Sequence, residues 1–391
     1  FLRCRNGKEI RRELGEKSID ISLREIDYLG RRFIVYLALV HEQSRAKLKQ
    51  FMGSRGGYIL HLDGTCEGDS PHLMSTIDGL SKIVLDNLKI PSENACQLIP
   101  FLRKIQQTYG DPIALVHDMG AAILHAVEEV FPAVPDYICH FHFLKDIGKD
   151  LFGHDYSTIR RHLKTHRIRS QLRKTARGLN EAIEDDADTR QCLHRYLETK
   201  QLREPQTPLR PLVSAYLIIS WVLEAKNESH GFGFPFDRPH LDFYLRLQEA
   251  DPKLQGLKQK MSAGAALLPL TPISNTLADK ALANTVLRML GKVRIFDQLR
   301  AAMRIAQPDS RAGLNEEGDA DISTIQARVT LFRYSEEIKE LAATTIAYQK
   351  MVKQIDKYWD KLFADPIQVA TPTGPISVQP QRTNNMLEQF F

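Results

Sequence analysis

The chain has 391 residues, of which 26% are charged and 43% apolar, and its formal net charge is +5. This length allows two or three domains, and the apolar fraction is enough for packed cores, so the composition excludes a wholly disordered or fibrous protein. The five cysteines are scattered and odd in number, which excludes a secreted disulfide framework and predicts a reducing, intracellular compartment. The longest apolar run, residues 212–223, falls short of the roughly 20 residues that span a bilayer, and no signal peptide precedes it, so we expect no membrane association.

The first 56 residues are predicted to form a helical connector. From Ser22 to about Phe51 apolar side chains recur at helical spacing, and Ser22 with Glu25 forms a capping box. The polar stretch before it, residues 3–20, has only weak periodicity. Because the chain begins with Phe1 and not with Met, we expect it to be a piece of a longer reading frame.

A strand-rich region follows at residues 57–150. Its apolar runs and turn residues predict five strands and two helices. The strands are expected at 58–62, 72–77, 80–88, 112–117 and 137–143, and the helices at 98–109 and around 123–130. Asp78-Gly79 is a typical hairpin turn between the second and third strands. The order β-β-β-α-β-α-β is typical of a ribonuclease H-like α/β sheet.

The strand pattern disappears after about residue 145, and residues 151–369 are predicted to be an all-helical insertion. The amphipathic segments lie at 172–184, 212–225, 241–250, 282–305 and 325–362. Residues 370–391 are predicted to hold a Pro/Thr/Gly linker, at 370–380, and a last helix of the core that opens near Thr383 or Asn385. We therefore expect an α/β core that is interrupted by a large all-α insertion and preceded by a helical segment.

Two acidic residues come directly after predicted strands of the core. Asp63 follows the first strand and Asp118 the fourth, and the carboxyl ends of neighbouring strands are where side chains of an open α/β sheet meet. Carboxylates held close together repel each other unless a cation lies between them, and oxygen ligands favour Mg²⁺ or Mn²⁺. A third acid, for which Glu388 is the candidate, would complete a site for two metal ions.

Each of these acids also has a plainer interpretation. Asp63-Gly64 is compatible with a simple turn, and Asp118 with the cap of the following helix. Glu388 forms a capping box with Asn385. The arrangement of the three acids is more informative than any one of them.

Four short strings of residues together resemble the DDE transposases. They are His61-Leu62-Asp63-Gly64-Thr65, Val116-His117-Asp118, Cys139-His140-Phe141-His142 and Arg382-Thr383-Asn384-Asn385-Met386-Leu387-Glu388-Gln389-Phe390-Phe391. The resemblance covers residues 57–391 and is closest to the Mutator-like and hAT-like branches. In those branches a Cys-x-x-His motif lies on the strand after the second acid, and a large all-helical insertion separates it from the final Glu.

The resemblance implies a catalytic role for the three acids. Asp63, Asp118 and Glu388 would bind two Mg²⁺ or Mn²⁺ ions, hydrolyse a phosphodiester at the end of a mobile element and promote attack of the freed 3′-OH on target DNA. It also implies that Cys139 and His142 lie beside the active site. Asn384 and Asn385 precede Glu388 by about one helical turn, so we expect them on the same side, within reach of the DNA backbone or the attacking water.

Cys139 and His142 have two other interpretations. They could bind zinc together with His162 and His166, although one thiolate is few for a zinc site. A buried cysteine with a hydrogen-bonded histidine is the plainer alternative.

Basic residues concentrate between residues 156 and 180, where no acid interrupts them. The eight are Arg160, Arg161, Lys164, Arg167, Arg169, Arg173, Lys174 and Arg177. The phosphate backbone of double-stranded DNA is the expected partner, and a solvated helix face is the alternative. Because an aromatic residue of the insertion stacks on a flipped base in hAT-like relatives, Trp221 is a further candidate for DNA contact, with core packing among its apolar neighbours as the alternative.

We therefore predict a DDE transposase of an insertion-sequence-type element that acts on element ends and target DNA as a homodimer or higher oligomer. It would work in the cytoplasm and nucleoid of a prokaryotic host, and residues 1–56 would be the remnant of a DNA-binding region. An inactive or domesticated remnant that only binds DNA is the alternative. Asp63-Gly64-Thr65 also suggests a haloacid-dehalogenase-like phosphatase, but His61 stands where that family has its nucleophile.

Overall fold

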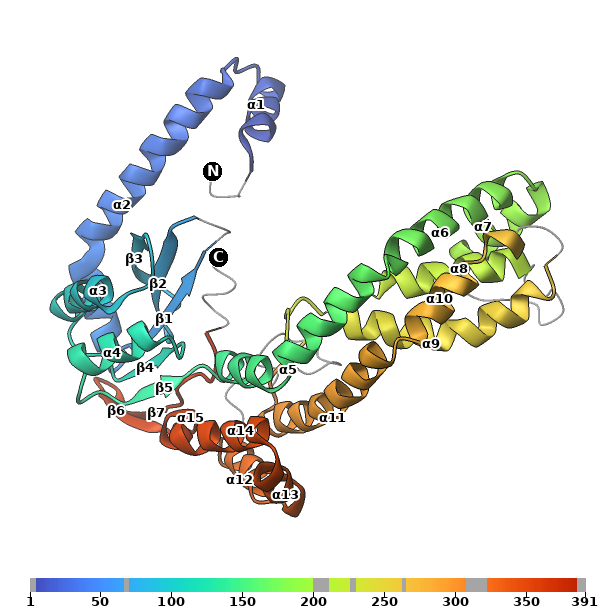
Figure 1. Cartoon of the computed structure of the whole chain (residues 1–391). Coiled ribbons are helices and arrows are strands. Elements are labelled where there is room, and N and C mark those ends of the chain that lie inside the picture. The colour runs from blue at the N-terminus through green and yellow to red at the C-terminus, as the bar shows by residue number, and fades with distance from the viewer. Residues whose placement is uncertain are drawn as a thin grey trace. The chain divides into compact units, whose positions relative to one another are not determined.

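The computed structural model of the chain describes residues 5–66, 70–199, 211–225, 230–261, 265–306 and 322–384. It divides into two compact units (Figure 1). The first unit joins Phe1–Tyr137 to Asp365–Phe391, and the second comprises Ile138–Ala364. No helix among the described residues carries an apolar stretch long enough to cross a bilayer.

The first unit is built on a five-stranded mixed sheet. Its strands are β1 (Ile59–Thr65), β2 (His72–Asp78), β3 (Val84–Ile90), β4 (Ala114–His117) and β5 (Asp136–Ile138), in the spatial order β3-β2-β1-β4-β5. β2 pairs antiparallel with both β1 and β3, whereas β4 pairs parallel with β1. Helix α3 (Ala95–Tyr109) precedes β4 and helix α4 (Ala121–Val130) follows it, so the elements have the predicted order.

Alternating side chains of β1 and β4 supply two separate cores. Leu60, Leu62 and Leu115 pack with α3 and α4 on one face of the sheet. The other face, with Ile59 and Val116, is covered by a second, two-stranded sheet of β6 (Ile367–Thr371) and β7 (Gly374–Val378). The linker predicted at 370–380 is therefore wrong. Val369 and Val378 are buried against Ile59, and this burial outweighs the loop-like composition of the segment.

Two strand ends differ from the prediction. The turn after β2 is longer than a two-residue hairpin, and β3 begins at Val84 rather than at Leu80. The buried Asp78 carboxylate holds this turn, because it accepts hydrogen bonds from the backbone N–H groups of Ile59, Leu80 and Ser81 at 3.0–3.1 Å. The strand predicted at 137–143 is wrong beyond Ile138, since a helix begins at His140.

The N-terminal segment contains two helices. α2 (Leu23–Ser54) begins where the capping box predicts, with Ser22 and Glu25 bonded reciprocally at 3.1 and 2.9 Å. Its C-terminal end joins the core of the sheet through Leu48 and Met52. The shorter α1 (Gly7–Glu16) was not predicted as a separate helix, although Asn6 and Glu9 form a capping box of their own.

After Cys139 the described residues of the second unit form helices and no strand. These are α5 (His140–Thr165), α6 (Ile168–Glu184), α7 (Ala187–Thr199), α8 (Pro211–Glu224), α9 (Pro239–Lys258), α10 (Leu270–Leu277), α11 (Lys280–Met303), α12 (Ile322–Arg333), α13 (Glu336–Thr344), α14 (Ile346–Lys357) and α15 (Trp359–Leu362), with a short 3₁₀ helix at Ala265–Leu267. The predicted boundary at residue 150 falls inside α5. The amphipathic segment predicted at 325–362 is divided into four helices, and Ser335 is the N-cap of the second of them.

Candidate metal centre

Asp63 and Asp118 lie side by side on neighbouring parallel strands. Leu62 of β1 is in register with His117 of β4, so the next residue of each chain segment is an aspartate. Ligand oxygens of the two carboxylates lie within 4.8 Å of each other. Asp63 is 3% exposed and Asp118 is partly buried. Two carboxylates this close are a place where a divalent cation relieves repulsion.

The plainer interpretations of both aspartates do not fit the structure. Asp63 is not in a turn, because β1 continues to Thr65 and Asp63 is paired with Ser75 of β2. Asp118 does not cap α4, whose N-cap is Gly120 and has no side-chain capping bond. Each carboxylate instead accepts a hydrogen bond from the backbone N–H of the residue that follows it, Gly64 or Met119.

A third acid, Glu93, lies beside these two and was missed by the sequence analysis. It stands in the loop between β3 and α3, next to the helix cap Asn94. A Cβ atom on Gly120 would clash with Glu93 Oε1, so this glycine leaves room for the side chain, and a Cβ atom on Gly64 would lie 3.9 Å from Oε2, at ordinary contact distance. Burial and then the negative charge of Asp118 raise the pKa of Glu93. The local sequence gives no sign of this, because the approach depends on the path of the loop.

Asn384 ties the C-terminal segment to β1 next to Asp63. Its Nδ2 donates to the carbonyl oxygen of Leu62 at 3.0 Å, so its Oδ1 accepts from Nδ1 of His61, also at 3.0 Å. His61 is fully buried, and this burial lowers its pKa to about 4, although the bond to Asn384 acts in the opposite direction. The neutral His61 ring therefore carries its proton on Nδ1. The amide group of Asn384, expected to reach toward DNA or water, is hydrogen-bonded to β1.

Four other residues were predicted for the site. Glu388 and Asn385 lie outside the described residues. Cys139 is buried and is the N-cap of α5, and His142 lies in the first turn of that helix. Both therefore come directly after β5, the neighbour of β4 in the sheet, but on a helix rather than on the predicted strand.

The histidine pair considered for zinc has a structural role in the second unit. His162 Nδ1 and His166 Nε2 lie 2.9 and 3.0 Å from the same oxygen of Asp279. Asp279 is the N-cap of α11 and accepts from the backbone N–H of Leu282. The two histidines thus tie α5 to α11, and within the described part of the chain they belong to no group of metal-ligating atoms.

Seven of the eight basic residues predicted to contact DNA are exposed. They lie at the end of α5 and along α6, and they are Arg160, Arg161, Lys164, Arg167, Arg173, Lys174 and Arg177. None of the seven has an acidic partner within 4.0 Å among the described residues. Arg169 differs, because its guanidinium lies 4.3 Å from the ring centroid of Phe243 and donates to the carbonyl of Pro239, and burial lowers its pKa. These seven exposed cations of the second unit are called here the α5–α6 basic surface.

Trp221 is partly buried on α8 and lies beneath two cations. The guanidinium of Arg246 is 4.9 Å from its ring centroid and the ammonium of Lys253 is 5.8 Å away. Arg246 also donates to the Trp221 carbonyl at 2.7 Å. The buried residues of α8 include Ile219 and Val222, which are close to Trp221 in the sequence. Core packing therefore describes these neighbours better than it describes Trp221 itself.

No protein-family model matches this chain, and no curated protein matches it either.

Proposed function

We propose that the chain is a DDE transposase of an insertion-sequence-type mobile element, with a ribonuclease H-like core. The observation that carries the proposal is the pair Asp63 and Asp118, in register on parallel strands with ligand oxygens within 4.8 Å. The strand order β3-β2-β1-β4-β5, with three antiparallel strands followed by helix-connected ones, supports the core topology. The all-helical second unit, which interrupts the first, supports the assignment of an insertion.

The donor atoms at this site fit a hard divalent cation. Asp63 and Asp118 offer carboxylate oxygens, which suit Mg²⁺ or Mn²⁺, and Glu93 adds negative charge nearby. We propose that these two aspartates, with Glu388 as the third ligand, hold two ions. When bound, the ions would neutralise charge on the phosphodiester and act as Lewis acids.

The other residues of the first unit would position this site. Asn384 fixes the C-terminal segment on β1, one residue from the strand position of Asp63. His61 stays neutral at physiological pH because its pKa is about 4, so it adds no positive charge that would compete with a cation. The α5–α6 basic surface would bind the phosphate backbone of duplex DNA.

The first experiment tests metal-dependent chemistry. Full-length wild-type protein should bind Mn²⁺, measured by electron paramagnetic resonance titration, and should nick supercoiled plasmid with Mg²⁺ or Mn²⁺. Asp63→Asn should abolish both while plasmid binding stays unchanged. Asp111→Asn is the matched control, because Asp111 is an exposed acid of the same unit whose bond from Gln106 an asparagine can keep. Full nicking by Asp63→Asn would refute the proposal.

The second experiment tests DNA binding and separates the active enzyme from the inactive or domesticated alternative. Arg173→Ala with Lys174→Ala should weaken duplex binding in fluorescence anisotropy and reduce the salt dependence, by a slope of about 0.9 for each phosphate that the variant no longer neutralises. Lys350→Ala with Lys353→Ala, two exposed lysines of α14, is the control. If the two double variants bind DNA equally well, the α5–α6 basic surface is only a solvated helix face. DNA binding without Mn²⁺ binding or nicking in the wild type would favour the domesticated protein.

A further inference from the structure

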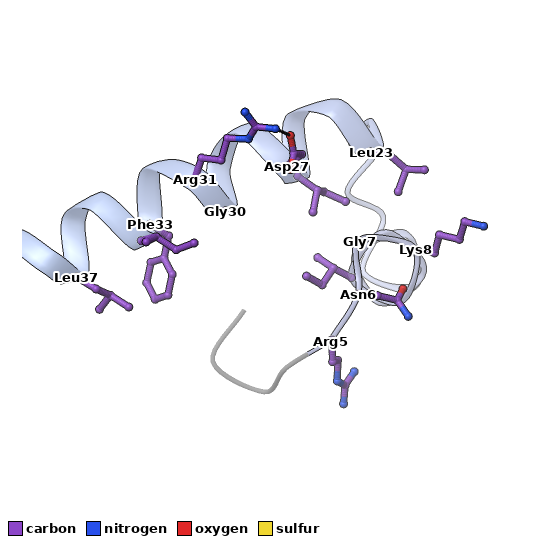
Figure 2. A pocket seen from close by; sticks show the side chains of 13 residues that line it. Arg5, Asn6, Gly7, Lys8, Leu23, Asp27, Gly30, Arg31, Phe33 and Leu37 are labelled. Carbon is purple, nitrogen blue, oxygen red and sulfur yellow. Dashed lines mark ion pairs between the residues drawn. The ribbon is translucent and has the colours of Figure 1, made fainter. Parts of the chain in front are cut away.

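Helix α2 carries an apolar surface that nothing in the described part of the first unit covers. Residues 33–40 are Phe-Ile-Val-Tyr-Leu-Ala-Leu-Val, two full turns that are apolar all round. A helix apolar on every side is normally buried on every side. α1 approaches α2 near the start of that helix, where Gly7 faces Leu23, and Phe33 and Leu37 line the same pocket further along α2 (Figure 2). On another side Val35 is 59% and Leu39 52% exposed.

This exposed side is a regular seam along most of the helix. The seam consists of eight residues at alternating spacings of three and four, the pattern of the apolar positions in a coiled coil. They are Glu25, Tyr28, Arg32, Val35, Leu39, Glu42, Ala46 and Lys49, and all eight are exposed. We call this set the α2 seam. It is separate from the side of α2 that enters the core of the sheet through Leu48 and Met52.

The α2 seam is complementary to itself when two copies run antiparallel. Centred on residue 37, Val35 faces the partner's Leu39, and Arg32 faces the partner's Glu42. Further out, Tyr28 faces the partner's Ala46 and Glu25 faces the partner's Lys49. Two-fold symmetry repeats each of these pairs. A parallel arrangement would instead place every charge opposite its own copy.

We propose that the α2 seam is a homodimer interface, in which a second copy of this chain packs antiparallel across it. In this arrangement Arg32 meets the partner's Glu42, and Glu25 meets the partner's Lys49. These pairs of opposite charge fix the direction and the register of the two helices, as polar positions do in coiled coils. Leu29 and Tyr36, which are 46% and 65% exposed, lie at the margin of the seam and would be covered with it. The dimer needs neither DNA nor metal, so it stands independently of the proposed enzymatic function.

The experiment measures the mass of the full chain in solution without DNA or metal. Sedimentation equilibrium at micromolar concentration should give twice the monomer mass of 44.6 kDa. Val35→Glu with Leu39→Glu should give a monomer. Circular dichroism should be unchanged, because both side chains are exposed in the single chain. A monomeric wild type would overturn the proposal, as would wild-type binding to lipid vesicles without self-association.

A charge swap tests the antiparallel register. Arg32→Glu alone or Glu42→Arg alone creates two like-charge contacts in the dimer and should raise the dissociation constant about tenfold or more. The double variant Arg32→Glu with Glu42→Arg should restore the wild-type value. Lys47→Glu makes the same change in charge as Arg32→Glu but lies off the seam, and should leave the dimer unchanged. Single variants that dimerise normally, or a double variant that fails to recover, would overturn the antiparallel seam.

Discussion

Replacing Asp118 by asparagine distinguishes a metal site from a structural carboxylate. Asparagine has nearly the same shape as aspartate, and its Oδ1 can keep accepting the backbone N–H of Met119. The substitution removes the negative charge that faces Asp63 and contributes to the raised pKa of Glu93. We therefore expect Asp118→Asn to stabilise the metal-free protein and to abolish any stabilisation by Mg²⁺.

The expected gain in the free energy of unfolding of Asp118→Asn follows from the distance between the two carboxylates. At the upper limit of 4.8 Å, two unit charges repel by about 3.5 kcal/mol with an effective dielectric constant of about 20. Asp118 is partly exposed, so water screens this repulsion, and about 1–2 kcal/mol should be recovered. For a cooperative unit of about 150–250 residues this corresponds to a rise in Tm of about 2–8 °C.

The assay is thermal unfolding of the full chain, followed by circular dichroism with EDTA and with saturating Mg²⁺. Wild-type Tm should rise with Mg²⁺, whereas Asp118→Asn should start higher in EDTA and not respond. Asp111→Asn should follow the wild type in both conditions. A variant whose Tm is lower in EDTA, or whose response to Mg²⁺ equals that of the wild type, would show that Asp118 has a structural role only.

Three further substitutions test the groups around the site and in the second unit. Glu93→Gln should stabilise the protein against urea at pH 7 but not at pH 4, because the raised pKa of Glu93 makes its ionisation unfavourable for folding once the pH exceeds the unfolded value of 4.5. Asp155→Asn should cost about 2–3 kcal/mol at pH 7, since Asp155 is 2% exposed and accepts three bonds from Arg288 and Lys292. Burial alone would raise the pKa of Asp155, but these bonds lower it below 3.8, so this cost should disappear in urea titrations as the pH falls below 3.8. Asn384→Ala should cost about 1–3 kcal/mol in the same titrations, because it leaves two buried hydrogen-bonding groups of β1 without their partner.

Local patterns were enough to predict the order of elements in the core and the meeting of its two aspartates. The start of α2 followed from Ser22 and Glu25, because a capping box is a contact within one helical turn. Asp63 and Asp118 could be paired because each comes at the end of an apolar run, and parallel strands bring such ends to one edge. These predictions needed no knowledge of distant contacts.

The features that were missed depend on contacts between distant parts of the chain. β6 and β7 looked like a linker because Pro, Thr and Gly dominate residues 370–380, and only their packing on Ile59 makes them strands. Glu93 has no local pattern, since the loop after β3 decides where it points. The bond between His61 and Asn384 joins residues 323 positions apart, so neither residue could identify the other in advance.

Those distant contacts also explain how the first unit tolerates so long an interruption. The strand that carries Asp63 and the segment that carries Asn384 belong to one compact unit, although the whole second unit lies between them in the chain. The entropy of closing a loop grows only with the logarithm of its length, by about 0.6 kcal/mol for each doubling. The two buried hydrogen bonds that Asn384 makes, one donated to Leu62 and one accepted from His61, and the packing of β6 and β7 on Ile59 are of a size to offset such a cost. The size of the helical unit is therefore weakly constrained by the stability of the core, whereas the contacts that bring the C-terminal segment back to β1 are strongly constrained.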